Sequence, residues 1–189
     1  MVVDFDILTI IVGIIIFLLI CMFINLKYNK EKIYYVFLTI MFCYLMCVVK
    51  LTLFPILLFE GMPSNIQASI NYIPFQNGIG RTEIYNLIMT IPLGIGTPFI
   101  TKMRGIKRMG ALGLATGCII ETLQYLEALW AGGFTLRVID INDIIFNLMG
   151  VIVGYVLLIL FSRIFVRYKD NEYNSFWQYV YEVCMTIHF

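Results

Sequence analysis

The chain has 189 residues, of which 61% are hydrophobic and only 13% are charged, and its mean hydropathy is +0.90. Soluble domains are typically about one-half apolar, so this composition excludes a soluble domain and predicts an integral membrane protein. The formal net charge of +1 identifies no partner, because topology separates the charges of a membrane protein. No nucleic-acid partner is indicated.

The cysteine and histidine contents exclude several kinds of site. The five cysteines lie in or beside apolar stretches without a CxxC spacing, so neither a disulfide framework nor a zinc site is indicated, and we expect core packing. The single histidine is His188, next to the C-terminus. A histidine-ligated metal or a histidine general base inside the helix bundle is therefore excluded.

Five apolar segments are long enough to cross about 30 Å of hydrocarbon as helices. The predicted spans are residues 7–26, 33–54, 84–100, 109–130 and 141–161. Only acidic residues precede the first, which argues against a signal peptide. Prolines and glycines interrupt the third, and a bundle can tolerate this. Turn residues dominate 59–83, although its aromatic residues indicate that part of this loop folds back onto the bundle.

Residues 172–189 are predicted to form an amphipathic helix. Apolar side chains recur there at helical spacing from Tyr173 to Ile187, and Trp177 is suited to the headgroup level. We therefore predict an all-α fold, a single integral membrane domain over residues 1–189 with five transmembrane helices and a C-terminal interfacial helix.

Basic residues concentrate in the turns after the first, third and fifth predicted spans. These turns hold ten of the thirteen Lys and Arg residues: Lys27, Lys30, Lys32, Lys102, Arg104, Lys107, Arg108, Arg163, Arg167 and Lys169. By the positive-inside rule, the N-terminus is predicted outside and the C-terminus in the cytoplasm. The polar residues of the fourth and fifth spans then lie between the bilayer centre and the outer surface.

The fourth and fifth spans carry matching series of small residues. If the two spans are antiparallel helices, Gly113 falls level with Gly154 and Gly117 with Gly150. Glycines four residues apart let two helix backbones approach closely inside a bilayer. We therefore expect these spans to contact each other through their glycines.

A polar cluster is predicted at the outer end of this hairpin. The same alignment pairs Glu121 with Asn147, Gln124 with Asp143, and Glu127 with Asp140. Acidic side chains in a membrane cost free energy and usually have a task. Their oxygens suit only a hard cation such as Mg²⁺ or Ca²⁺, and no other cofactor is predicted. Without a metal, a crowded carboxyl tends to keep its proton, as a general acid or a proton carrier does.

Part of this cluster also has a structural explanation. Asp140 or Asp143 can cap the N-terminus of the fifth helix, the amides can bond across helices, and Arg137 can pair with a cap. Glu121 has no helix end to cap, so we expect it to have a function. Lys50, in the last two turns of the second span, either extends to the interface or acts as the counter-ion of a carboxylate such as Glu121.

Several short motifs follow one another in an order and spacing that resemble the VanZ-like family of bacterial membrane proteins. They are Asn71-xx-Pro74-Phe75, Asn86 with Ile91-Pro92-Leu93-Gly94, Glu121-xx-Gln124, and Arg137-xx-Asp140-xx-Asp143-xxx-Asn147-xx-Gly150-xxx-Gly154. The resemblance covers a core of about residues 71–155. The chain departs from the family between Gln124 and Arg137, where its segment is longer and adds Glu127 and a glycine pair.

The resemblance implies a multi-pass protein of the bacterial plasma membrane with a role in the cell envelope, because the family is named for a protein associated with resistance to glycopeptides, chiefly teicoplanin. One hypothesis is a non-enzymatic outward pocket that binds or shields a lipid or lipid-linked precursor. Its expected lining is Asn71, Asn86, Gln124, Arg137, Asn147 and Lys50. The other is an enzyme that modifies or hydrolyses such a lipid, with Glu121, Asp140 and Asp143 as candidate catalytic residues. Five spans without an inverted repeat argue against a transporter.

Overall fold

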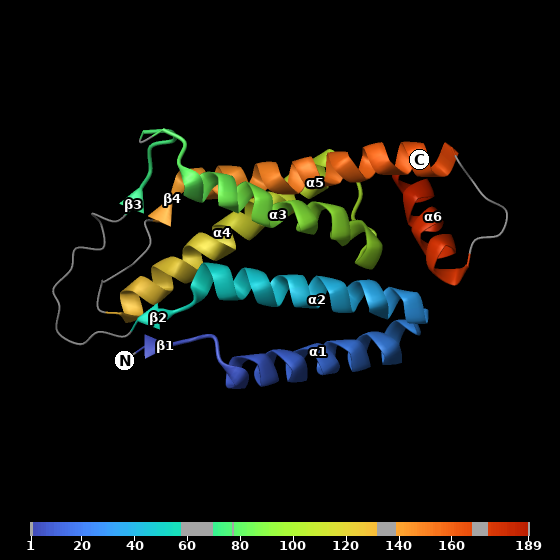
Figure 1. The fold of residues 1–189 in the computed structure, drawn as a ribbon, viewed down its shortest axis with the longest axis horizontal. Helices are drawn as coiled ribbons and strands as arrows, with labels where there is room; N and C mark the ends of the chain where they lie inside the picture. The colour runs from blue at the N-terminus through green and yellow to red at the C-terminus, as the bar shows by residue number, and fades with distance from the viewer. Residues whose placement is uncertain (1, 58–69, 77, 132–138, 168–173, 189) are drawn as a thin grey trace.

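The computed structural model describes residues 2–57, 70–76, 78–131, 139–167 and 174–188, and these form an all-α bundle (Figure 1). Its helices are α1 (Ile7–Tyr28), α2 (Lys32–Leu53), α3 (Arg81–Ile100), α4 (Ile106–Trp130), α5 (Ile141–Arg167) and α6 (Ser175–His188). Four strands of two residues each pair at one end of the bundle. The predicted all-α class is confirmed.

The strand pairs bring distant segments together at the ends of helices. β1 (Val2–Val3) pairs antiparallel with β2 (Ile56–Leu57), so the N-terminal segment meets the residues that follow α2. β3 (Ile70–Asn71) pairs in parallel with β4 (Ile139–Asp140), directly before α5. The loop that precedes α3 therefore folds back onto the bundle, as predicted.

Three helices, α1, α2 and α5, are long and apolar enough to span a membrane by length and composition. Among the described residues, the mean hydropathy of α3 and α4 is too low for a membrane span by this measure. Polar residues lower it in both helices, and α3 also contains prolines and glycines. The five predicted spans are therefore not confirmed, although a helix lies at each predicted position.

Helix α5 lies between α3 and α4 and contacts both over much of its length. Val151 and Tyr155 of α5, both almost fully buried, form the core with Leu93 of α3, Met109 of α4 and Met41 of α2. This packing places the first turn of α5 next to the start of α3 and the second half of α4.

The glycine contacts differ from the prediction. A Cβ added at Gly150 would overlap the carbonyl oxygen of Leu87, and one added at Gly154 would overlap that of Ile91, so both glycines pack against α3 rather than α4. The predicted pairing of Gly154 with Gly113 and of Gly150 with Gly117 is wrong. The reason is that α5 has two packed faces, and its glycines lie on the one that meets α3.

The glycines of α4 contact bulky residues of α5 instead. A Cβ at Gly113 would lie 2.8 Å from the Cα of Leu148, and one at Gly117 would lie 2.8 Å from the Cα of Ile144. Gly113 and Gly117 therefore lie beside residues of α5 that come six positions earlier in the chain than the predicted partners. This shift brings Glu121, rather than Glu127, to Asp140.

The predicted C-terminal helix is present as α6, which packs against α5, α2 and α3. The Tyr179 hydroxyl donates to the carbonyl oxygen of Phe99, and Val180, Val183 and Cys184 are buried against α3 and α5. Burial raises the pKa of the Cys184 thiol to about 11. Cys184 therefore packs in the core as predicted.

The other cysteines do not follow that prediction. Cys43, Cys47 and Cys118 are exposed on helix surfaces and Cys21 is half-buried. All five cysteines are free. In a membrane bundle, an apolar helix surface can face lipid as well as protein, so apolar surroundings in the sequence did not identify the core.

Candidate functional site

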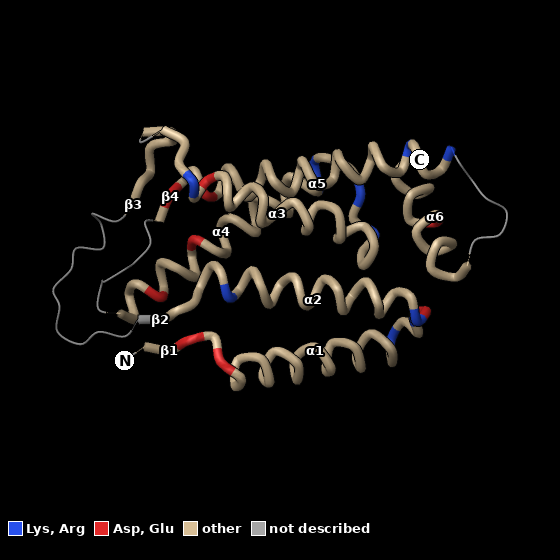
Figure 2. Tube along the Cα trace, in the orientation of Figure 1, with Lys and Arg blue, Asp and Glu red and all other residues tan. Residues whose placement is uncertain are grey.

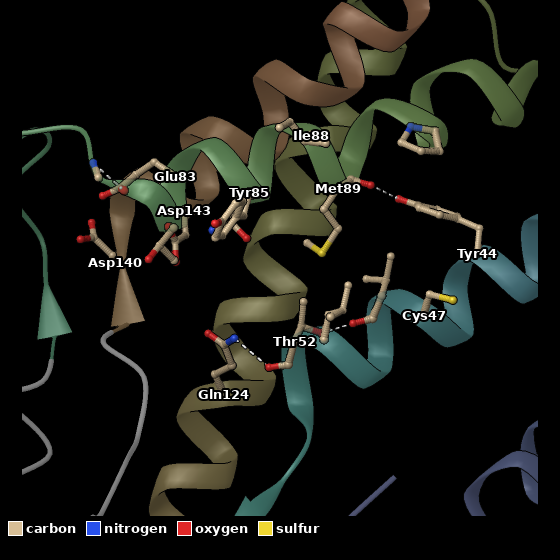
Figure 3. Close-up of a pocket in the computed structure, with 16 residues that line it drawn as sticks. Tyr44, Cys47, Thr52, Glu83, Tyr85, Ile88, Met89, Gln124, Asp140 and Asp143 are labelled. Atoms are coloured by element: carbon tan, nitrogen blue, oxygen red, sulfur yellow. Dashed lines mark hydrogen bonds between the residues drawn. The ribbon is translucent and has the colours of Figure 1, made fainter. Parts of the chain in front are cut away.

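A cavity of about 970 Å³ lies between α2 and α3, and α4 and the start of α5 contribute to one end of it (Figure 3). Its long walls are mostly apolar and include Val48 and Leu51 of α2 and Ile88, Met89 and Pro92 of α3. Three carboxylates, from Glu83, Asp140 and Asp143, gather at the end where α3 and α5 start. The cavity therefore has an apolar part and an acidic part.

Asp140 is fixed by hydrogen bonds from two segments. The Asn71 side-chain Nδ2 donates to both carboxylate oxygens of Asp140, at 3.0 Å each, and the backbone N–H of Asn142 donates to Oδ1 at 2.8 Å. The second bond is an N-cap of α5. Capping therefore explains one aspartate, and Asn71 holds β3 on β4 beside it.

The same end of α5 also anchors the loop that follows β3. The backbone N–H of Phe75 donates to the Asn142 side-chain oxygen at 2.9 Å, and the Phe75 ring lies edge-on to Phe146. Asn142 is fully buried. The loop and the first turn of α5 therefore form one hydrogen-bonded unit beside the cavity.

Glu121 is buried, 5% exposed, and does not line the cavity. Its Oε2 accepts the backbone N–H of Asp140 at 3.0 Å, and its Oε1 has no hydrogen-bond partner among the described residues. The geometry therefore makes Glu121 a support for β4 and for the start of α5. It brings Glu121 to Asp140, whereas the sequence alignment paired Glu121 with Asn147 and Asp140 with Glu127.

Asp143 lies at the cavity surface, 7% exposed, with the Asn86 side chain beside it. Asn147 lies one turn further along α5 and is fully buried, and neither of its side-chain polar atoms has a partner among the described residues. The Thr90 hydroxyl donates to the backbone oxygen of Asn147 at 2.9 Å, which joins α3 to α5. Asn86 and Asp143 are thus parts of the cavity, whereas Asn147 lies behind its wall.

Gln124 links α4 to α2. Its side-chain Nε2 donates to the backbone oxygen of Thr52 at 2.9 Å, as Figure 3 shows, and both residues line the cavity. Gln124 is 8% exposed, and its Oε1 has no partner among the described residues. Gln124 therefore presents an unused acceptor at the boundary between the apolar walls and the acidic end.

Of the predicted pocket residues that the structure describes, Lys50 does not line the cavity, and neither does Asn71 or Asn147. Lys50 is exposed, its Nζ lies 5.7 Å from the centre of the Phe5 ring, and it forms no ion pair with any acid in the described ranges. This position fits the interpretation that Lys50 extends to the interface, not that it neutralises Glu121. Arg137 lies outside the described residues.

Sequence reasoning missed the walls from α2 and α3. Glu83 precedes Asn86 by one helical turn and lies on the same helix face, which indicates that a polar site begins there. Residue 83 was nevertheless predicted to belong to the loop before the third span. Tyr44 and Thr52 gave no such signal, because the pattern of α2 is mostly apolar and no polar face stands out. The Tyr44 hydroxyl donates to the carbonyl oxygen of Met89 at 2.8 Å and so joins the two walls.

Within the described part of the chain, no group of three or more His, Cys, Asp or Glu side chains is arranged to hold a metal ion. Both oxygens of Asp140 already accept hydrogen bonds from Asn71. A divalent cation at this site stays a prediction.

Comparison with known proteins identifies the family. A family model described as VanZ/LLP1 matches residues 37–162, about two thirds of the chain. The match confirms the resemblance found in the motifs and extends it to most of α2, which forms one wall of the cavity. No curated protein and no solved structure matches the chain significantly.

Proposed function

The chain belongs to the VanZ/LLP1 family of membrane proteins, and from this we propose that it binds or shields a lipid or a lipid-linked component of the bacterial cell envelope in the cavity between α2 and α3. We further propose that this lowers susceptibility to glycopeptides of the teicoplanin type. The protein would act without chemical turnover.

The two-part lining of the cavity carries this proposal. A lipid has an apolar chain and a polar head, and the cavity offers apolar walls from α2 and α3 with carboxylates at one end. Its volume of about 970 Å³ is at the upper end of what small-molecule sites typically have, roughly 300–1,000 Å³. Exposed Leu51 and Ile88 on the two walls suit a lateral approach from the surrounding lipid.

The distribution of charge supports the predicted orientation. Lys and Arg residues gather mainly at the end of the bundle where α1 and α5 finish, and Asp and Glu mainly at the end where these helices begin (Figure 2). By the positive-inside rule, the basic end is cytoplasmic. The acidic end of the cavity then faces the outer surface, where envelope precursors and glycopeptides meet.

A second candidate function is an enzyme that modifies or hydrolyses an envelope lipid. The observation that favours it is that Asp143 and Glu83 reach the cavity from two helices, so one could act as acid and the other as base. Turnover of lipid by the purified protein, with or without a chelator, separates this candidate from simple binding.

The test of binding uses a matched pair of variants in α2. Cys47 lines the cavity, whereas Cys43 lies one turn away and does not, and both are exposed. Expressed in a susceptible bacterium, the wild type and Cys43→Trp are expected to raise the teicoplanin concentration that inhibits growth, and Cys47→Trp is not, because its indole fills the cavity. If both variants protect equally when equal amounts of each are present in the membrane, the cavity is not needed for the function.

Orientation is tested with an impermeant thiol reagent on intact cells, in a background without native cysteines. Thr82→Cys, at the acidic end, is expected to react, and Lys102→Cys, after α3, is not. Lys102 is chosen over Gly105, which lies in the same turn, because the φ of +91° at Gly105 disfavours any residue with a Cβ. The reverse labelling pattern would place the acidic end in the cytoplasm.

A further inference from the structure

We propose that the polar group which enters the acidic end of the cavity is a cation of the ammonium type, carried on an apolar chain. This inference rests on the proposed binding function and specifies the class of ligand. It follows from the charges at that end, from its hydrogen-bonding groups and from the side-chain oxygen of Gln124, a cavity-lining residue, which has no partner among the described residues.

The charged residues that line the acidic end are all of one sign, although Arg81 lies close to Glu83 in the chain at the start of α3. Glu83, Asp140 and Asp143 line the cavity, and none of its lining residues within the described ranges is Lys, Arg or His. The nearest basic residue on α2, Lys50, extends to Phe5 instead. A phosphate or carboxylate head would add a like charge beside these groups, whereas an ammonium would neutralise one of them.

Hydrogen bonding points the same way. The donors that line the cavity are largely committed, since the Tyr44 hydroxyl donates to Met89 and Gln124 Nε2 donates to Thr52. The Gln124 Oε1 acceptor, by contrast, has no partner among the described residues, and Gln124 is 8% exposed. Ionised carboxylates only accept, and an ammonium offers three donors and no acceptor. The site therefore has acceptors for a donor-rich head.

Asp143 is the carboxylate best placed to contact that head. Asp140 is bound by Asn71 and by the N-terminus of α5, and one oxygen of Glu83 accepts the backbone N–H of Gly80 at 2.9 Å. For Asp143, in contrast, Asn86 is the neighbouring polar side chain at the cavity. We expect Asp143 to supply the charge and Gln124 Oε1 to supply a second acceptor.

The test measures binding of three probes with the same chain, dodecylammonium, dodecanol and dodecyl phosphate, to the full-length protein in a neutral detergent by native mass spectrometry. Dodecylammonium is expected to bind at least about tenfold more tightly than dodecyl phosphate. Butylammonium, which lacks the long chain, is expected to bind at least about tenfold more weakly than dodecylammonium. Equal binding of the two amines would indicate a free cation rather than a lipid headgroup and would overturn the proposal.

Variants assign the preference to the cavity. Asp143→Asn is expected to reduce the preference for ammonium over phosphate to about threefold or less, and Glu83→Gln to reduce it by a smaller factor. The control is Asp4→Asn, which removes one exposed negative charge from the same end of the molecule. Its preference is expected to equal that of the wild type.

The outcomes separate the two proposals. If all three twelve-carbon probes bind equally, or if dodecyl phosphate binds best, the inference is wrong and the amphiphile-binding function stands. If the preference survives in both Asp143→Asn and Glu83→Gln, the ammonium does not lie at these acids and the inference is wrong. If no probe binds to the folded protein, the proposed function fails as well.

Discussion

Helices α1 and α5 are both apolar enough to span a membrane, but they pack very differently. In α1 Gly13 is the buried residue, and α5 has ten. α1 also precedes the region that matches the family, residues 37–162.

The difference shows that hydropathy and packing are separate properties in a membrane protein. Lipid is as apolar as a leucine side chain, so helices associate through close backbone approach and hydrogen bonds rather than through hydrophobicity. α5 has both, through Gly150, Gly154 and the bond from Thr90. At Gly13 of α1, by contrast, the atoms nearest to an added Cβ belong to the side chains of Met46 and Phe42 and not to backbone.

The largest effect is expected from a methyl group at Gly150. In Gly150→Ala the new Cβ would overlap Leu87 O and Thr90 Oγ1, so α3 and α5 must separate. Overpacking of this kind costs about 1–3 kcal/mol or more, and here the obstacle includes rigid backbone. We expect little folded protein in size-exclusion chromatography and a clear loss of thermal stability.

The matched control is Gly110→Ala in α4. There the new Cβ would lie 3.7 Å from the nearest side-chain atom, Ile152 Cδ1, which is ordinary contact. The substitution should keep or raise stability, since alanine favours a helix over glycine by about 1 kcal/mol. Equal damage from both substitutions would mean that the close contact of α5 with α3 is not what holds the pair.

An intermediate effect is expected at Glu121, where α4 supports the start of α5. Glu121→Leu leaves the backbone N–H of Asp140 without its acceptor and should cost about 1–3 kcal/mol of unfolding free energy. Glu121→Gln keeps an oxygen that can accept this bond and should unfold close to the wild type. Denaturation monitored by circular dichroism compares the two.

The same pair tests whether Glu121 acts only by support. If Glu121→Gln folds normally but loses protection against teicoplanin, ionisation of Glu121 is required and the supporting role described above is insufficient. If protection against teicoplanin falls in Glu121→Leu and Glu121→Gln only as far as their stability falls, the role of Glu121 is to support the start of α5.

The smallest effect is expected in α1. Leu19 is 54% exposed, so Leu19→Ala should change stability by less than about 0.5 kcal/mol. Its counterpart in α5, Leu158→Ala, removes a side chain that is 3% exposed and should cost about 2 kcal/mol or more. Similar losses of stability for the two variants in thermal unfolding would show that the side chains of α1 pack against the bundle as those of α5 do.

The sequence predicted the helices well and their neighbours poorly. Hydropathy was sufficient for α1, α2 and α5, and helical spacing of apolar residues for the C-terminal helix, because these patterns depend on single segments. The glycine spacing correctly marked helices that approach closely, but it carries no information on which partner they approach. Gly150 and Gly154 could face α3 or α4, and only the assembled bundle shows that they face α3.

The candidate site was also predicted in part. An acidic residue of α4 was expected beside Asp140, but the predicted residue was Glu127, and the register shift of six residues brings Glu121 there instead. The capping role of Asp140 could be predicted, because an aspartate directly before a helix can accept the backbone N–H of the second helical residue, which here is Asn142. The apolar walls were not predicted, because a cavity is defined by what neighbouring helices leave unfilled, and no single helix pattern records it.

The two faces of α5 divide small and large residues differently. Toward α3, α5 supplies Gly150 and Gly154 and α3 adds Gly94; toward α4, α5 supplies Ile144 and Leu148, and α4 supplies the glycines. A larger residue at Gly117 would meet the Cα and carbonyl oxygen of Ile144, and one at Gly150 would meet the carbonyl oxygen of Leu87, so a smaller side chain at 144 or 87 cannot compensate for it. In relatives of this chain, residues 117 and 150 should therefore each stay small whatever residue stands at 144 or 87, so that neither interface evolves by compensating pairs.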